Sequence, residues 1–233
     1  MNKYLELGVD EFNKSWLADM EEITPGKTIR SGGRPTKAAP FGEDGTWWKA
    51  QGPAYIQSWL SWRQANPNLH ILKMDDGSPA IELGVLADIE VDGGEVIQLK
   101  GYIDRVFVDE STGQVLIVDL KTGKTTPNGM QLGFYKRALK AAYGIDAQYG
   151  AYWMAREGAL SAIEDLDRFT DQVIDYWVAK TYAGVQAGIF LPHITNLCKG
   201  CGVKQHCYVF NPDTIFSPIH TNTQVVTQEV ASV

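Results

Sequence analysis

The order of apolar and polar residues predicts a chain that alternates between strands and helices. Alternating or β-branched runs bounded by turn formers are typical of strands, and a continuous apolar run is typical of a buried strand. Such runs lie at about 80–91, 95–108, 114–121 and 147–155. Between the second and third runs, Asp109, Ser111 and Gly113 indicate a hairpin turn. These two strands should therefore pair antiparallel.

Four other segments have apolar residues at helical spacing. They cover about 9–20, 44–64, 129–143 and 166–187. The second of these helices is rich in aromatic residues. Most of them are expected to fill the core, and one or two at a cleft could stack on unpaired bases. The rings are those of Trp47, Trp48, Tyr55, Trp59 and Trp62. The order α-β-β-β-α-β predicts an α/β (α+β) core with a mixed sheet flanked by helices.

Charged residues interrupt two of the predicted strands near their ends. Asp104 follows Gly101-Tyr-Ile, and Asp119 and Lys121 lie two apart in the run that ends the next strand. Residues two apart on a strand point to the same face, so these two side chains should emerge together, with Asp104 across the hairpin. Neighbouring carboxylates repel unless a cation joins them, and Mg²⁺ binds one or two carboxylates with waters and phosphate oxygens. The alternative is a minor surface ion pair between Asp119 and Lys121.

Gln131 and Tyr135 lie four apart on one face of the helix that follows. The order G-x-x-D, D-x-K, Q-x-x-x-Y resembles the RecB-like branch of the PD-(D/E)XK nuclease superfamily over about 80–220. This resemblance implies a restriction-endonuclease-like core in which the helix lies beside the active site. It implies that Gln131 and Tyr135 hold the region of the substrate that is cut.

The same resemblance implies a metal-dependent reaction. Asp104, Asp119 and the carbonyl of Leu120 would bind Mg²⁺ or Mn²⁺, and Lys121 would assist the attacking water. Glu82, in the predicted first strand, is similar to an acidic residue of the family that lies near the metal; a solvent-facing role is the alternative. The family often has a histidine on the preceding helix. Here Gln57 is a candidate substitute, unless the site has fewer protein ligands.

Cys198, Cys201 and Cys207 form a C-x2-C-x5-C run that contains every cysteine of the chain. This spacing suits thiolates on one metal and is poor for disulfides. The branch of the family that includes the CRISPR adaptation nuclease joins such a triple to an upstream cysteine to hold a 4Fe-4S cluster. No cysteine precedes Cys198 here, so His206, His193, an N-terminal acid, water or a missing upstream segment would complete the site. A Cys₃His zinc site and three free buried thiols are the alternatives; either metal would be structural.

Composition is consistent with a single nuclease domain. The 233 residues, 44% of them hydrophobic, contain no repeat and no run of transmembrane length. We expect a cytoplasmic protein, in the bacterial host cell if a phage encodes it. The formal net charge of −7 argues against a nonspecific nucleic-acid coat but allows local basic clusters. The expected divisions are an N-terminal helix and loop, the core, the cysteine segment and a tail, at 1–43, 44–190, 191–210 and 211–233.

Two further segments bear on function. The Gly/Pro/basic stretch 27–37 is either a loop that contacts DNA phosphates or a solvated linker. The tail from Asn211 is expected to cross the surface or to be disordered. Thr122-Gly-Lys-Thr125 looks like the end of a phosphate-binding loop, but Val118 stands where that motif needs glycine, which argues against an ATPase.

We therefore expect a metal-dependent DNA exonuclease that acts on ends or single strands, similar to the stand-alone RecB-like proteins that phages use in recombination or replication. One alternative is a non-catalytic DNA-end-binding or adaptor module on the same fold. Another is a nuclease subunit that is active only with a partner helicase or recombinase. No membrane partner is expected.

Overall fold

The computed structural model describes residues 2–23, 43, 45–91, 93–123, 127–189, 191–195, 198 and 200–212. The predicted basic stretch 27–37, residues 124 and 125 of the loop 122–125, and the tail beyond 212 therefore lie outside the described residues. By its internal contacts the chain divides into two compact units. The first contains Met1–Ala87 and Gln98–Thr170, and the second contains Asp88–Ile97 and Asp171–Val233.

A seven-stranded mixed sheet forms the framework. Its strand order is β1-β3-β4-β5-β6, with β2 also paired to β3 and β7 to β5. The strands are β1 (Leu69–Ile71), β2 (Ile81–Glu90), β3 (Val96–Asp109), β4 (Val115–Lys121), β5 (Tyr149–Met154), β6 (Ala159–Leu160) and β7 (Glu164–Asp165). The four predicted strands are confirmed as β2, β3, β4 and β5, whereas the short β1, β6 and β7 were not predicted.

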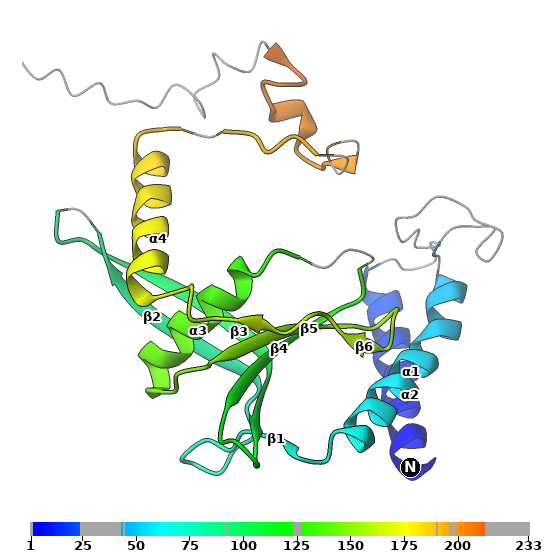
Figure 1. Cartoon of the computed structure of the whole chain (residues 1–233). Coiled ribbons are helices and arrows are strands. Elements are labelled where there is room, and N and C mark those ends of the chain that lie inside the picture. Colours follow the sequence, from blue (N-terminus) through cyan, green and yellow to red (C-terminus); the bar gives the residue numbers. More distant parts are fainter. Residues whose placement is uncertain are drawn as a thin grey trace, which may run out of the picture. The chain divides into compact units, whose positions relative to one another are not determined.

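Strands β3 and β4 pair antiparallel, as the hairpin signal predicted. Gly113 provides the turn with a φ of 72°, a conformation that residues with a Cβ rarely adopt. Strand β5 lies parallel to β4, and a parallel pair requires a crossover connection. Helix α3 (Met130–Tyr143) is that crossover. This connection returns α3 to the sheet beside the end of β4 (Figure 1).

Helices α1 (Asn2–Ile23) and α2 (Gly45–Ala65) lie side by side (Figure 1). They approach closely at Gly52, where a Cβ would come within 2.2 Å of the Phe12 ring. One face of the sheet is covered by α2, since Trp59 and Trp62 pack against the core cluster that contains Phe107 and Trp153. The prediction that aromatic residues of this helix belong to the core is confirmed for these two rings.

The second unit contains the tip of the β2–β3 hairpin, helix α4 (Asp171–Gln186) and the C-terminal segment. Tyr182 of α4 donates a hydrogen bond of 2.6 Å to the carboxylate of Glu95. The predicted helix over 166–187 begins later, at Asp171, because Leu166 is buried in a turn that follows β7. No helix in the described part of the chain is long and apolar enough to cross a membrane.

Candidate active site

Asp119 lies near the end of β4 with its side chain almost fully buried. The described pairing of β3 with β4 stops at Arg105 and Val118, one step before Asp104 would face Asp119. Instead, Asp104 Oδ2 accepts a hydrogen bond of 2.7 Å from the backbone N–H of Leu120. The two predicted acids therefore lie together where the ladder opens.

The predicted lysine completes this group from the same strand. Lys121 Nζ lies 2.5 Å from Asp119 Oδ2, and the lysine side chain is 28% exposed. It therefore reaches both the buried carboxylate and solvent. The spacing of two along β4 is what brings Asp119 and Lys121 to one face.

Helix α3 adds two polar side chains to Asp119. Gln131 Nε2 donates hydrogen bonds to Asp119 Oδ1 at 3.0 Å and to the Tyr135 hydroxyl at 2.8 Å. The Tyr135 hydroxyl in turn lies 3.4 Å from the same carboxylate oxygen. Gly101 makes room for this ring, because a Cβ there would lie 3.3 Å from Tyr135 Cε1. The sequence predicted that these helix residues lie beside the acids, and their contacts with Asp119 have that arrangement.

The electrostatics of Asp119 favour a cation. Burial raises the pKa of this carboxyl, and the charge of Asp104 raises it further, although Lys121 opposes both effects. Asp119 Oδ2 is buried and, despite its ion pair with Lys121, has no hydrogen bond of good geometry in the described structure. A buried carboxylate oxygen without a hydrogen bond is costly. A divalent cation between the two acids would relieve both the desolvation and the repulsion.

The donor set fits Mg²⁺ or Mn²⁺. Among the described residues, no group of three or more His, Cys, Asp or Glu side chains is arranged to hold a metal. The protein therefore offers two carboxylates and a neighbouring backbone carbonyl, that of Leu120. Mg²⁺ commonly binds through one or two carboxylates and takes its other oxygens from water and substrate phosphate. The residues present are thus sufficient for that ion.

Two further candidates from the sequence lie outside this network. Glu82 is 65% exposed in its side chain and pairs with Arg105 at 3.2 Å. It also has a φ of 47°, which is strained for a residue with a side chain. Gln57 is half-buried on α2. In the described contacts, neither residue bonds to Asp104 or Asp119.

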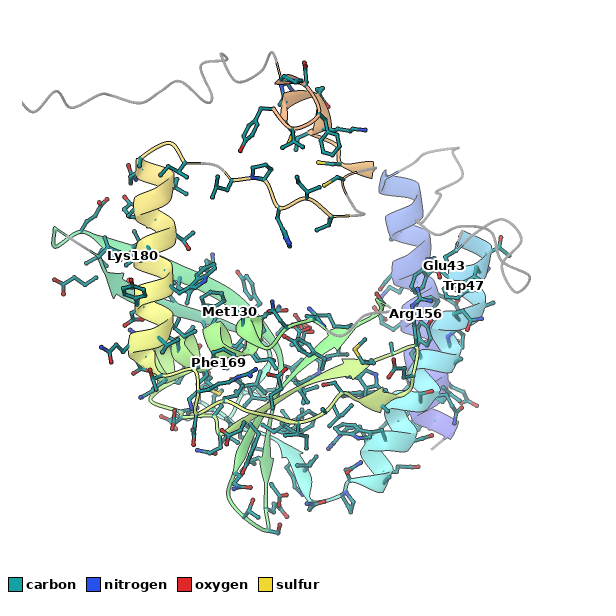
Figure 2. All side chains as sticks on the ribbon, turned by 45° about the horizontal axis from the view of Figure 1, so that its top comes forward. Glu43, Trp47, Met130, Arg156, Phe169 and Lys180 are labelled. Atoms are coloured by element: carbon teal, nitrogen blue, oxygen red, sulfur yellow. The ribbon has the colours of Figure 1, made fainter. Side chains whose placement is uncertain are left out.

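Arg156 is a site neighbour that the sequence did not reveal. Its Nε donates to the Thr122 carbonyl, directly after β4, at 2.6 Å. Its other nitrogens form a two-pronged ion pair with Glu43 at 3.1 and 2.6 Å (Figure 2). The guanidinium also packs on the rings of Trp47 and Trp48. Glu43 and Arg156 are 113 positions apart, so no local pattern could have found this pair.

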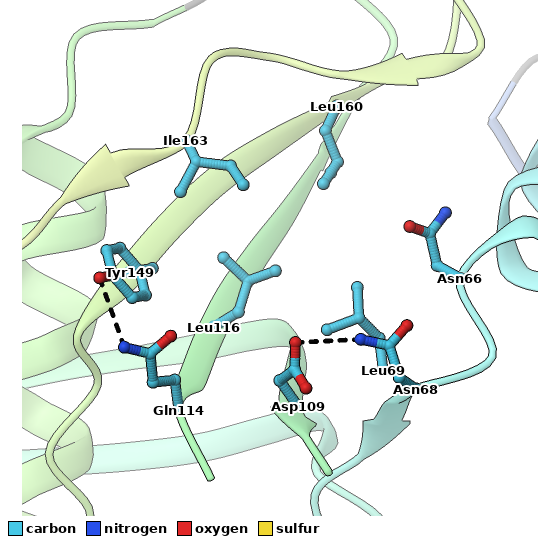
Figure 3. A pocket seen from close by; sticks show the side chains of 9 residues that line it. All are labelled: Asn66, Asn68, Leu69, Asp109, Gln114, Leu116, Tyr149, Leu160 and Ile163. Atoms are coloured by element: carbon cyan, nitrogen blue, oxygen red, sulfur yellow. Dashed lines mark hydrogen bonds between the residues drawn. The ribbon is translucent and has the colours of Figure 1, made fainter. Parts of the chain in front are cut away.

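One described hollow lies apart from this site. It has a volume of about 400 Å³ and lies beyond the opposite end of β4 (Figure 3). Leu116, which lines it, alternates with Asp119 along the strand and so faces the other side of the sheet. We place the candidate active site at the acids and not at this hollow, because the lining of the hollow includes none of the residues that contact Asp119. Its lining is Asn66, Asn68, Leu69, Asp109, Gln114, Leu116, Tyr149, Leu160 and Ile163.

The described residues of the cysteine segment, 198 and 200–207, form turns and the short 3-10 helix η2 (Lys204–His206) in the second unit. The backbone N–H of Cys201 bonds to the Cys198 carbonyl at 3.4 Å, and that of Cys207 bonds to the Lys204 carbonyl at 3.1 Å. None of the three cysteines forms a disulfide. The described positions do not gather them into a metal-holding group, so the predicted cluster gains no support from this geometry.

Comparison with known proteins identifies relatives of this chain. The family model of the PD-(D/E)XK nuclease superfamily matches residues 15–208. The Gene 69 protein of Mycobacterium phage D29 is 33% identical over 162 residues, which cover 66% of this chain and 57% of that protein. The Gene 69 protein of Mycobacterium phage L5 is 32% identical over 161 residues, covering 66% of this chain and 52% of that protein. The chain thus spans little more than half the length of these two relatives. The crystal structure of SSO0001 matches with a TM-score of 0.41 and 14% identity, over 84% of this chain and 96% of that chain.

Proposed function

Because this chain belongs to the PD-(D/E)XK nuclease superfamily, we propose that it is a metal-dependent deoxyribonuclease that acts as an exonuclease on DNA ends or single strands. The observation that carries the proposal is the buried Asp119 carboxylate, which contacts Lys121 on one oxygen and Gln131 on the other. The negative charge of a carboxylate in those surroundings is unfavourable without a cation. A metal ion would stabilise it and could also bind the phosphodiester.

In this proposal Asp104, Asp119 and the Leu120 carbonyl hold Mg²⁺ or Mn²⁺. Such an ion, when bound, lowers the pKa of a bound water and offsets charge on the phosphate. Lys121 places its ammonium beside the same carboxylate, where it can orient the attacking water and stabilise negative charge on the phosphate oxygens. Glu82, held by Arg105, takes no direct part.

Gln131 and Tyr135 have a positioning role. Their hydrogen bonds fix the plane of the Asp119 carboxylate, so that Oδ2 is directed away from α3 and toward Lys121. Polar groups that orient a metal-binding carboxylate commonly affect affinity and activity without contacting the metal. Their remaining hydrogen-bonding capacity would contact the substrate backbone near the cut.

We propose a role in phage DNA recombination or replication, in the cytoplasm of an infected bacterial cell; the support from the comparisons is that both relatives are phage proteins. We include a partner recombinase or helicase in this proposal, and its support is the membership of the nuclease family alone. We further propose that the cysteine segment holds a structural 4Fe-4S cluster, with zinc as the alternative. The support for it is the C-x2-C-x5-C spacing alone.

The decisive experiment follows cleavage of three labelled DNAs: a linear duplex, a linear single strand and a covalently closed circle. We expect Mg²⁺- or Mn²⁺-dependent shortening of linear DNA and an intact circle. Asp104→Ala, Asp119→Ala and Lys121→Ala should each lower the rate at least about 100-fold while circular dichroism stays unchanged. Glu157→Ala, an exposed acid in the turn after β5, is the matched control and should cleave normally.

Undiminished cleavage by Asp119→Ala protein would refute the assignment. Cutting of the closed circle would replace the exonuclease by an endonuclease. Tight binding of DNA ends without cleavage, alone or with any divalent metal, would favour the adaptor module.

A further inference from the structure

Tyr152 is a fully buried polar side chain that the proposed mechanism does not use. It lies on β5 directly beside Asp119 of β4 in the parallel register. Paired residues of neighbouring strands point to the same face, so the Tyr152 side chain lies on the same face of the sheet as Asp119 and Lys121. A hydroxyl buried at this position needs a partner and a reason.

The ring of Tyr152 contacts the catalytic lysine. Lys121 Nζ lies 5.7 Å from the ring centre, within the range in which an aromatic face attracts an ammonium group. The same nitrogen lies 2.5 Å from Asp119 Oδ2. The ammonium therefore contacts both a carboxylate and a ring.

The hydroxyl of Tyr152 contacts the start of α3. It donates a hydrogen bond of 2.8 Å to the backbone carbonyl of Asn128. The Asn128 side-chain oxygen in turn accepts from the N–H of Met130, the first residue of the helix, at 3.3 Å. Gly129, at the N-cap, provides no side-chain hydrogen bond. The tether from β5 through Asn128 therefore fixes the turn that places Gln131.

We propose that Tyr152 is a positioning residue of the nuclease site: its ring holds the Lys121 ammonium toward Asp119, and its hydroxyl sets the start of α3 so that Gln131 reaches the same carboxylate. This inference rests on the proposed function. It assigns two separable tasks to one side chain, which substitutions can remove one at a time.

Tyr152→Phe removes only the hydroxyl, and Tyr152→Leu removes the ring as well. We expect Tyr152→Phe to lower kcat about tenfold with KM for DNA changed less than about twofold. In the Gln131→Ala background the same substitution should change kcat by less than about twofold, because the tether acts through Gln131. Tyr152→Leu should lower kcat by about a further tenfold, so that the phenylalanine variant rescues the contribution of the ring.

Tyr149→Phe is the matched control. It removes a hydroxyl from the same strand, at the hollow on the other side of the sheet, where that oxygen accepts from Gln114. It should leave kcat unchanged. Hydrogen exchange supplies a second measurement that is independent of activity: amides 128–133 should exchange faster in Tyr152→Phe than in wild type or Tyr149→Phe.

An additive loss of kcat in the double variant, or unchanged exchange at the start of α3, would overturn the tether. Equal kcat for the phenylalanine and leucine variants would overturn the role of the ring. If the wild type cleaves no DNA, the proposed function fails on its own, and the exchange measurement still decides whether Tyr152 fixes α3.

Discussion

Gln131 reaches from the first turn of α3 to Asp119 on β4 through a hydrogen bond of 3.0 Å. The same amide nitrogen donates to Tyr135, so one side chain links the helix, the second polar residue and the buried acid. This contact is possible because β4, α3 and β5 form a parallel crossover that lays the helix against the end of the strand. The site is thus assembled from β3, β4 and α3, which follow one another in the chain.

The first prediction concerns these helix residues. Gln131→Ala should lower cleavage about tenfold, because Asp119 loses the hydrogen bond that orients it while the acid itself remains. Tyr135→Phe should have a smaller effect, since its hydroxyl lies at the longer distance of 3.4 Å from the carboxylate. Steady-state cleavage, measured beside urea denaturation, checks this. Reduced stability with unchanged turnover in both variants would assign these residues to packing alone.

Much of this site could be predicted because its residues are close in sequence and their spacing matches the local structure. A spacing of two on a strand brings Asp119 and Lys121 to one face, and a spacing of four on a helix does the same for Gln131 and Tyr135. The strand alternation likewise predicted the hairpin that brings Asp104 near.

Other features depended on tertiary contacts that no local pattern encodes. Glu82 lies on the predicted strand, yet its side chain pairs with Arg105, and its backbone has a positive φ at the start of β2. Tyr152 appeared only as part of a continuous apolar run, and its contact with Asn128 spans the whole α3 crossover. Arg156 pairs with Glu43, which lies 113 positions earlier in the chain. Each of these required the register of the sheet.

The second prediction concerns Gly101. Its replacement by alanine places a Cβ 3.3 Å from Tyr135 Cε1, so the ring must move by a few tenths of an ångström. We expect cleavage to fall several-fold, by about the amount that Tyr135→Phe loses or more. Gly84→Ala on β2 is the control, because its Cβ would meet the Tyr102 ring at an ordinary 3.5 Å. Equal activity of the two variants would show that the fit at Gly101 does not matter.

The third prediction concerns pH. Burial raises the pKa of Asp119, so its carboxylate forms at a higher pH than that of an ordinary aspartate, about 3.9. Cleavage, which needs the carboxylate, should therefore rise with pH over that higher range. In the metal-free protein the folded state binds this proton more tightly than the unfolded state. The resulting stabilisation is present at low pH and is lost as pH rises through the folded-state pKa.

The free energy of unfolding of Asp119→Asn, relative to wild type, should therefore increase as pH rises above the usual aspartate pKa of about 3.9. Asp109 provides the opposite control. Hydrogen bonds from Ser111 lower its pKa, so it stabilises the fold above the usual aspartate range, and that stabilisation is lost as pH falls. Denaturation in a chelator across this range checks both. The same pH trend for Asp119→Asn and Asp109→Asn would contradict the assigned shifts.

The fourth prediction concerns Arg156. Its pair with Glu43 is mostly buried, with side chains 18% and 12% exposed, so Arg156→Ala takes an arginine partner away from a mostly buried carboxylate. We expect a loss of about 3–5 kcal/mol in the free energy of unfolding. Arg168→Ala, which breaks a pair with Glu164 whose arginine is 59% exposed, should lose no more than about 1 kcal/mol. Urea denaturation of the two variants decides this. A similar small loss in both would mean that the Glu43 pair contributes little.

The last prediction concerns the cysteine segment. If Cys198, Cys201 and Cys207 bind one metal centre, its binding free energy contributes to folding, so each serine variant should lose metal and melt at a lower temperature together. Protein purified without oxygen should be brown and contain iron, or colourless and contain zinc. Val203→Ala is the control, because Val203 lies in the same segment, is exposed and cannot bind a metal. Three serine variants that keep the melting temperature of the wild type would show that these cysteines are ordinary thiols that hold no metal.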